Sequence, residues 1–259
     1  MNPAGLDANL YYPQPYPHGY WTPSAYGYEV TPQDCHFTAV DGTELHAWWI
    51  PVADDQAPAL LFCHGNAGNV TYRLDNLVRL QQAGISTFIF DYRGYGRSQG
   101  QPAEMGLYQD VRAAYDHLSQ CLGIPAGRIV AFGRSLGGAV ALHLATDPQR
   151  PLAGLVIEST FTSLSAIAEI FFPRLPSGLL AGQYDSIHRV QQINVPLLVV
   201  HGEEDELIPF SQGQALYAAA PEPKQFYAVP EGRHNDTYLV AGDDYFVRLG
   251  EFCKQVIQP

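Results

Sequence analysis

Short apolar runs alternate with amphipathic stretches along most of the chain. The runs are apolar at almost every position, as expected for strands buried on both faces, whereas amphipathic stretches are typical of helices that cover a sheet. The pattern predicts strands at residues 35–40, 44–50, 57–63, 86–91, 128–133, 154–159, 196–201 and 225–229. It predicts helices at residues 70–83, 103–122, 136–147, 211–219 and 237–256. This alternation indicates an α/β fold, with a mostly parallel eight-stranded sheet and helices on both of its faces.

The N-terminal stretch does not share this pattern. Residues 1–30 contain six tyrosines and five prolines, with neither a basic segment nor an apolar run. A signal peptide or a membrane-spanning helix is therefore not expected. The aromatic content favours an arm that packs across the domain over a disordered segment. We divide the chain into a Tyr/Pro-rich arm, residues 1–34, and a domain, residues 35–259.

One pentapeptide, Gly-Arg-Ser-Leu-Gly at residues 133–137, stands between a predicted strand and a helix rich in small residues. A serine at such a sharp turn projects its hydroxyl from the edge of the sheet, and small flanking residues let the strand and helix approach closely. The N–H groups at the start of the helix favour negative charge beside it. Ser135 is therefore the candidate nucleophile. A simple N-cap would be the structural alternative.

The same Gly-x-Ser-x-Gly pattern occurs a second time, at residues 96–100. Ser98 lies several residues after strand 86–91, within a glycine-rich loop, and Pro102 follows it. Because no helix begins directly at Ser98, this serine does not satisfy the strand–turn–helix requirement. We interpret it as an ordinary loop serine.

A serine hydroxyl needs a base, and the base needs an orienting acid. Asp205 follows strand 196–201, and His234 follows the last predicted strand on a glycine-containing loop. The order Ser135, Asp205, His234 is the one expected of an α/β-hydrolase triad. Three neighbouring carboxylates compete with Asp205 for the acidic role: Glu203, Glu204 and Glu206.

A candidate oxyanion hole follows strand 57–63. The loop at residues 64–69 reads His-Gly-Asn-Ala-Gly-Asn and is built of small residues where a backbone N–H would have to face a substrate oxygen. We expect the backbone N–H groups of Asn66 and Leu136 to act together, since two donors aimed at developing charge lower the barrier by several kcal/mol. A plain strand-to-helix turn, with Asn69 capping the next helix, is the alternative.

With these motifs in order, the chain resembles the α/β-hydrolase superfamily over about residues 35–257. The motifs that carry the resemblance lie at residues 64–69, 91–98, 133–137, 201–205 and 232–234. The chain looks most like the small-cap hydrolases that include the eukaryotic protein depalmitoylases, although it lacks their cysteine-rich, lipid-modified N-terminus. The resemblance implies a serine hydrolase acting on esters or thioesters. It also implies a structural, ion-paired role for Arg93.

The stretch between strands 154–159 and 196–201 is expected to set the substrate preference. Residues 160–195 are too few for a large lid, but they contain an apolar cluster broken by two prolines. One interpretation is a small cap, with Phe171, Phe172 and Leu175 lining an acyl pocket. The other is a helix that buries its apolar face on the core.

Composition limits the possible partners. The 259 residues suffice for one domain with a substantial core, and a net charge of −12 argues against nucleic acid or anionic membranes as partners. The four cysteines are widely spaced, with neither a Cys-x-x-Cys motif nor a Cys/His ligand pattern. We therefore expect neither a metal site nor a disulfide framework, and a cytoplasmic protein. A serine triad needs no cofactor, and the resemblance implies a small-molecule ester or acyl substrate.

These observations predict an esterase or thioesterase that forms an acyl-enzyme. A peptidase or amidase with the same triad and a catalytically silent binding protein are the alternatives. Haloalkane and epoxide hydrolases of this fold use an aspartate nucleophile, and Ser135 argues against that class.

Overall fold

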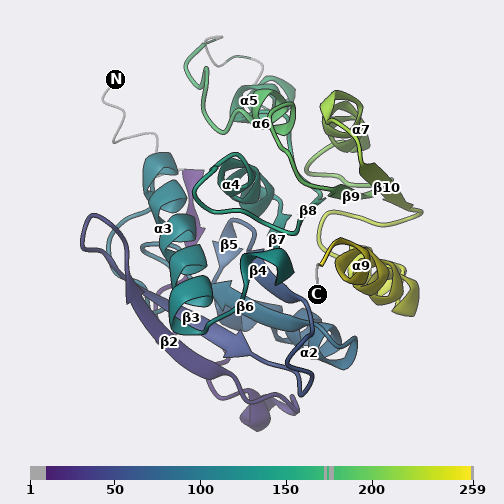
Figure 1. Ribbon diagram of the computed structural model, residues 1–259. Coiled ribbons are helices and arrows are strands. Elements are labelled where there is room, and N and C mark those ends of the chain that lie inside the picture. The colour runs from purple at the N-terminus through teal and green to yellow at the C-terminus, as the bar shows by residue number, and fades with distance from the viewer. Residues whose placement is uncertain (1–9, 172–173, 175–177, 258–259) are drawn as a thin grey trace.

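The computed structural model describes residues 10–171, 174 and 178–257 and is built around one eight-stranded sheet (Figure 1). The strand order across the sheet is β10-β9-β8-β7-β4-β6-β3-β2. The strands are β2 (Gln33–Thr38), β3 (Glu44–Ile50), β4 (Ala59–Cys63), β6 (Ser86–Phe90), β7 (Ile129–Arg134), β8 (Gly154–Glu158), β9 (Leu197–Gly202) and β10 (Lys224–Val229).

The sheet is mostly parallel, as the apolar runs predict. Strands β6, β4, β7, β8, β9 and β10 pair in parallel, whereas β3 is antiparallel to both β2 and β6. All eight predicted strands are present, and each end lies within two residues of the predicted one. Apolar side chains at successive positions are buried because both faces of the sheet are covered.

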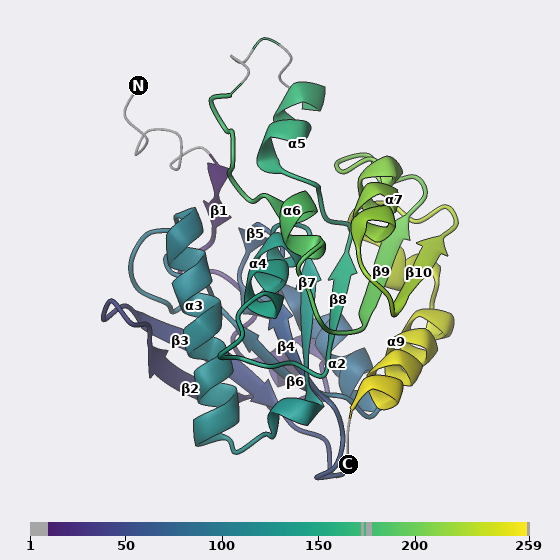
Figure 2. The same cartoon turned by 45° about the horizontal axis from the view of Figure 1, so that its top comes forward.

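Helices cover both faces of the sheet, and each face has its own apolar core (Figures 1 and 2). One face carries α3 (Glu104–Asp116), α4 (Leu136–Ala145), α6 (Ser186–Val190) and α7 (Phe210–Ala219). The other carries α2 (Leu74–Gln82) and α9 (Asp243–Val256). None of the helices in the described ranges has the length and apolar character needed to cross a membrane.

Three predicted helices are interrupted or change type. The stretch expected at residues 70–83 begins as a 3-10 turn, η2 (Val70–Arg73), and continues as α2. The stretch expected to be helical at residues 103–122 is α-helical as α3 and then continues as a π turn, η3 (His117–Cys121). The stretch expected at residues 237–256 is divided into α8 (Thr237–Val240) and α9. The division falls at Gly242, whose φ of 58° lies in the left-handed region that a helix interior does not use.

The candidate site residues lie where the strand order reverses. The chain passes from β4 to its neighbour β6 and then crosses over to β7, on the other side of β4. The direction of the connections therefore reverses at β4. In open α/β sheets, ligands bind outside the carboxyl ends of the strands at this switch point. The loop 64–69 follows β4, and Ser135 follows β7, so both stand at that edge.

Part of the N-terminal arm is packed against this edge. Strand β1 (Tyr12–Pro13) pairs in parallel with β5 (Ala67–Gly68), and η1 (Pro23–Tyr26) follows it along the chain. Tyr11 is buried, with 5% of its surface exposed. From residue 10 onward the arm therefore lies against the domain.

Candidate active site

Ser135 occupies a sharp turn between β7 and α4. Its backbone has φ 54° and ψ −120°, a conformation that costs a non-glycine residue energy and that persists only where the surroundings enforce it. The turn is held by a hydrogen bond of 2.9 Å from the Ser135 N–H to the Glu158 carbonyl of the neighbouring strand β8. The strand–turn–helix context required of a nucleophilic serine is present.

The glycines around Ser135 are required by close packing. A Cβ at Gly133 would collide with the Gly137 carbonyl, and a Cβ at Gly137 would collide with the Cys63 carbonyl at the end of β4. Helix α4 can therefore begin directly above the sheet only because both positions lack a side chain.

The structure brings Ser135, His234 and Asp205 together. The Ser135 Oγ lies 3.1 Å from the His234 Nε2, and the His234 Nδ1 lies 2.9 and 3.1 Å from the two carboxylate oxygens of Asp205. An ionised carboxylate only accepts, so Nδ1 carries the imidazole proton and Nε2 is free to accept the serine proton. His234 is 6% exposed and Asp205 7% exposed.

Asp205 is held as a carboxylate. Its burial would raise the pKa, but hydrogen bonding from His201 and His234 and from the Ile208 N–H outweighs burial and holds the pKa well below the usual range. The Leu207 and Ile208 N–H groups donate to Oδ1 at 3.0 and 2.7 Å. The acid is thus fixed in charge and orientation.

The three competing carboxylates lie differently. Of these four carboxylates, Asp205 is the one that hydrogen bonds to the His234 ring, whereas Glu206 accepts a hydrogen bond of 3.2 Å from the His234 backbone N–H. Glu203 and Glu204 are exposed.

Ser98, the alternative serine, has a different environment. Its hydroxyl donates to the Asp91 carbonyl at 2.6 Å and accepts from the His46 N–H at 2.9 Å. These bonds join β3 to the loop after β6, which is a structural role.

The loop after β4 lies directly beside the Ser135 turn. A Cβ at Gly65 would lie 3.6 Å from the Cβ of Ser135, so the loop and the serine are in van der Waals range. The Leu136 N–H is the first of the helix N–H groups that lack an intrahelical acceptor. The Asn66 side chain is bound on both of its polar atoms: Nδ2 donates to the Leu10 carbonyl at 2.7 Å, and Oδ1 accepts from the Tyr95 hydroxyl at 2.8 Å.

Sequence reasoning missed two polar groups behind the serine. Arg134 donates from Nη2 to the His234 carbonyl at 2.8 Å, and its Nε lies 3.8 Å from Oε1 of the fully buried Glu158. Glu158 also accepts from the Thr237 hydroxyl and, at 2.7 Å, from the Tyr245 hydroxyl. A signal was available, because charged residues at the ends of two buried strands need partners.

The candidate acyl-binding residues are only partly described. Helix α5 (Leu164–Phe171) begins with the buried Leu164 and ends with Phe171, which is 44% exposed. Phe172 and Leu175 lie outside the described residues. Helix α5 thus turns the buried Leu164 and the partly buried Ile167 to the core and leaves its last turn, including Ile170, accessible.

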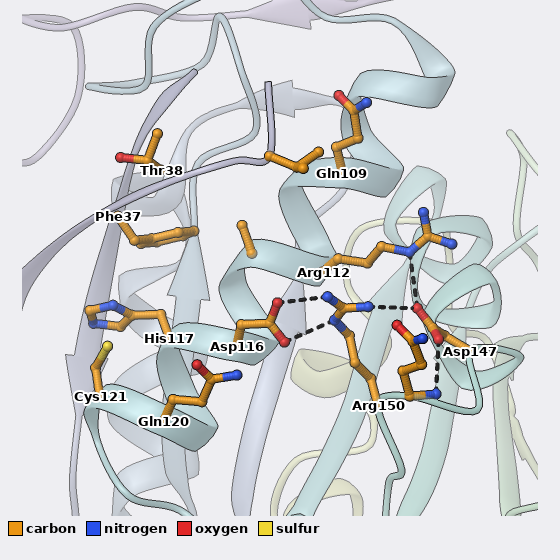
Figure 3. A pocket seen from close by; sticks show the side chains of 13 residues that line it. Phe37, Thr38, Gln109, Arg112, Asp116, His117, Gln120, Cys121, Asp147 and Arg150 are labelled. Carbon is orange, nitrogen blue, oxygen red and sulfur yellow. Dashed lines mark hydrogen bonds and ion pairs between the residues drawn. The ribbon is translucent and has the colours of Figure 1, made fainter. Parts of the chain in front are cut away.

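A separate hollow of about 690 Å³ lies between α3 and the Asp147–Arg150 turn (Figure 3). The triad residues do not line it. Its charged side chains pair with one another: Arg150 contacts Asp116 at 2.7 Å and Asp147 at 2.9 Å, and Arg112 contacts Asp147 at 3.0 Å. Both arginines and both aspartates of this network are ion-paired with one another, so none of these four groups is left to bind a charged ligand. Within the described ranges, no group of three or more His, Cys, Asp or Glu residues could hold a metal ion.

Comparison with known sequences identifies related proteins. The family model described as serine aminopeptidase, S33, matches residues 54–181 and 166–237. An uncharacterized protein of Mycobacterium tuberculosis, Rv2307c, is 40% identical over 235 residues, covering 90% of this chain and 82% of that protein. The α/β-hydrolase domain-containing protein WAV2 of Arabidopsis thaliana is 34% identical over 254 residues, covering 88% and 82%.

Comparison with solved structures agrees on the fold. An esterase of Pyrococcus furiosus superposes with a TM-score of 0.77, covering 96% of this chain and 98% of the esterase, at 22% sequence identity. At that identity the likeness concerns the architecture.

Proposed function

Because the chain belongs to the α/β-hydrolase superfamily, and within it to the family described as serine aminopeptidase, S33, we propose that it is a serine hydrolase that cleaves carboxylic ester or thioester bonds. The observation that carries the proposal is the contact chain from Ser135 through His234 to Asp205, with distances of 3.1 and 2.9 Å. A buried, ionised acid beside the histidine gives the base its orientation and stabilises its protonated form.

The reaction proceeds in two halves. His234 Nε2 takes the proton of Ser135 as Oγ attacks the substrate carbonyl, and the tetrahedral intermediate collapses when the protonated histidine gives its proton to the leaving alcohol or thiol. The acyl group is then bound to Ser135. His234 next activates a water molecule, which attacks the acyl-enzyme and releases the carboxylic acid.

The negative charge of each tetrahedral intermediate needs donors. The backbone N–H groups of Asn66 and Leu136 belong to the two segments that approach Ser135, one from the loop after β4 and one from the start of α4. We assign these two groups as the oxyanion hole. The dipole of α4 supports the same charge.

An amidase or peptidase activity is the second candidate. The description of the family, serine aminopeptidase, favours it, whereas the structural likeness to an esterase and the short segment between β8 and β9 favour esters. A p-nitrophenyl ester and a p-nitroanilide with the same acyl group separate the two. Because p-nitrophenyl esters are intrinsically more reactive, the anilide decides: ester turnover with no detectable anilide cleavage supports the proposal, and anilide cleavage at a kcat/KM comparable to that of the ester contradicts it.

The direct test is covalent labelling. We expect a fluorescent fluorophosphonate to label the wild-type protein and the Ser98→Ala variant, but not Ser135→Ala. Assays with p-nitrophenyl esters of different acyl length should show that Ser135→Ala loses turnover, while its circular dichroism spectrum stays that of the wild type. Labelling that persists in Ser135→Ala would refute the assigned nucleophile, and a folded wild-type protein that neither labels nor hydrolyses any ester would refute the enzyme.

A further inference from the structure

The N-terminal arm runs alongside the loop that we assign to the oxyanion hole. Strand β1 lies beside β5, at the end of the molecule where α5 also lies (Figure 2). Gln14 donates from its backbone to the Gly68 carbonyl at 3.0 Å, and Tyr20 donates to the Thr71 hydroxyl at 2.9 Å. The Asn69 amide donates to two arm carbonyls, those of Gln14 and His18, at 2.9 Å each. The contact therefore extends over the length of the loop.

Asn66 is the point where the arm reaches the site. Its Nδ2 donates to the Leu10 carbonyl at 2.7 Å, and its Oδ1 accepts from the Tyr12 N–H at 3.2 Å. The primary amide thus pairs with the arm backbone on both sides, as a neighbouring strand would. The buried Tyr95 hydroxyl also donates to Oδ1, which is the third hydrogen bond of this side chain.

The backbone on either side of Asn66 is also held, by the His64 ring at the Gly65 carbonyl (2.7 Å) and by Arg73 at the Ala67 carbonyl (2.6 Å), but these bonds do not act on Asn66 itself. Gly65, Ala67 and Gly68 have no side chain that could anchor the chain around Asn66. An oxyanion donor must be placed within a few tenths of an ångström, because a misplacement of about 1 Å costs on the order of a hundredfold in rate. A side chain bonded to three groups at once fixes the main chain to which it is attached.

We propose that the arm is part of the active site. The backbone of residues Leu10–Tyr12 hydrogen bonds to the side-chain amide of Asn66 and thereby sets the direction in which the Asn66 backbone N–H points, toward the reacting carbonyl. Asn66 is the positioning residue in this arrangement. Position 12 contributes only its backbone N–H, and the exposed Tyr12 side chain takes no part. The inference rests on the proposed function. The arm is also joined to the segment between β8 and β9, because the buried Tyr11 and Tyr184 hydroxyls are 2.6 Å apart.

Position 12 offers a matched pair of variants. The Tyr12 side chain is 63% exposed, so Tyr12→Ala removes little buried surface and keeps the N–H. Tyr12→Pro removes the N–H that donates to Asn66. In the full-length protein, with the p-nitrophenyl ester that the wild type cleaves fastest, Tyr12→Pro should lower kcat by about tenfold to a hundredfold with little change in KM. Tyr12→Ala should keep the wild-type kcat.

A second substitution tests the other side of the amide. Asn66→Asp keeps the oxygen that accepts from Tyr12 and Tyr95 but loses the donor to the Leu10 carbonyl, so kcat should fall again while KM stays near wild type. Because its carboxylate also places negative charge beside the oxyanion hole, Asn66→Ala, which removes the same side-chain bonds without adding charge, is measured with it and should lose kcat as well. Loss of kcat in Tyr12→Pro or in Asn66→Ala, with Tyr12→Ala unaffected, supports the positioning role. If Tyr12→Pro does not fold, Asn66→Ala decides.

The outcome that overturns the inference is distinct from failure of the proposed function. Equal kcat for Tyr12→Pro and Tyr12→Ala, with Asn66→Ala also at the wild-type rate, would mean that the arm packs on the loop without setting its geometry. A loss of kcat in Asn66→Asp accompanied by an equal fractional rise in the unfolded population would likewise show a structural role only. In both cases the wild type still hydrolyses the ester; absence of wild-type labelling and turnover would instead refute the serine hydrolase itself.

Discussion

The Arg134 guanidinium donates a hydrogen bond of 2.8 Å to the backbone carbonyl of His234, so the residue before the proposed nucleophile holds the loop of the proposed base. His234 lies 99 residues after Ser135 and 100 residues after Arg134 in the chain. The arginine is itself 7% exposed and lies near the buried Glu158. The end of β7 and the loop after β10 are therefore fixed to each other by a charged group that takes no part in the proposed chemistry.

Replacing Arg134 should slow turnover without weakening substrate binding. Arg134→Met keeps the length and apolar stem of the side chain but removes the bond to the His234 carbonyl. We expect kcat to fall about tenfold or more with KM nearly unchanged, because a misaligned base affects the chemical step. Steady-state kinetics on the preferred ester, with circular dichroism on the same sample, checks this. A fall confined to KM would argue against the positioning role.

Glu158 provides the control for Arg134. Arg134→Met leaves a buried carboxylate with two hydroxyl partners, which should cost about 1–3 kcal/mol of folding free energy. Adding Glu158→Gln removes the unpaired charge, so the double variant should recover part of the stability but none of the kcat. Urea unfolding of both variants separates the two effects; recovery of kcat together with stability would attribute the loss to destabilisation.

Asp205→Asn should abolish most activity in a folded protein. An asparagine of the same shape can present its N–H₂ to Nδ1, which favours the wrong imidazole tautomer and removes the charge that stabilises the protonated ring. We expect kcat to fall by ~10³ to 10⁴-fold. Glu204→Gln, at an exposed position, serves as the control and should retain the wild-type rate. Comparable losses in both variants would reopen the choice of acid.

The turn at Ser135 was predictable because the strand, the small residues and the serine lie within one short stretch. The order of Asp205 and His234 follows from the order of the strands. The central strands of the sheet were predictable because each is an apolar run. The sequence pattern does not predict the division between α8 and α9, because a single glycine within a helical stretch does not reveal that its φ of 58° ends the first helix.

The supporting contacts could not be predicted because no local pattern encodes them. Leu10 and Asn66 are 56 residues apart and meet only once the arm has paired with the loop after β4. Arg134 could have pointed to solvent or to any buried acid. Its partner became evident only when β7, β8 and the loop after β10 were brought to one edge.

Acid should destabilise the fold through His143. Burial first, and then the nearby Arg189 guanidinium, lower the pKa of His143 from 6.5 to about 3. The unfolded chain therefore takes up a proton that the folded protein does not, and the free energy of unfolding should fall as the pH is lowered from 6.5 toward 3. Denaturant unfolding at pH 7 and pH 5 measures the loss. His143→Gln, which cannot titrate, should show a smaller loss between these two values; an unchanged loss would place the titrating groups elsewhere.

Arg93 and Asp110 form a buried pair whose role we expect to be structural. Arg93 donates to one Asp110 oxygen from Nε and Nη2, at 2.9 and 2.8 Å, and its backbone N–H donates to the other at 2.8 Å. Asp110 is fully buried, so Arg93→Met leaves an uncompensated carboxylate and should cost about 3–5 kcal/mol. Adding Asp110→Asn should make the total loss smaller than the sum of the single losses, because the two residues act as one unit. Unfolding free energies of the three variants give the coupling. Neither residue touches the triad in the described part of the chain, so kcat per labelled active site should stay at the wild-type value; a specific loss of kcat in the folded double variant would show that this pair reaches the site after all.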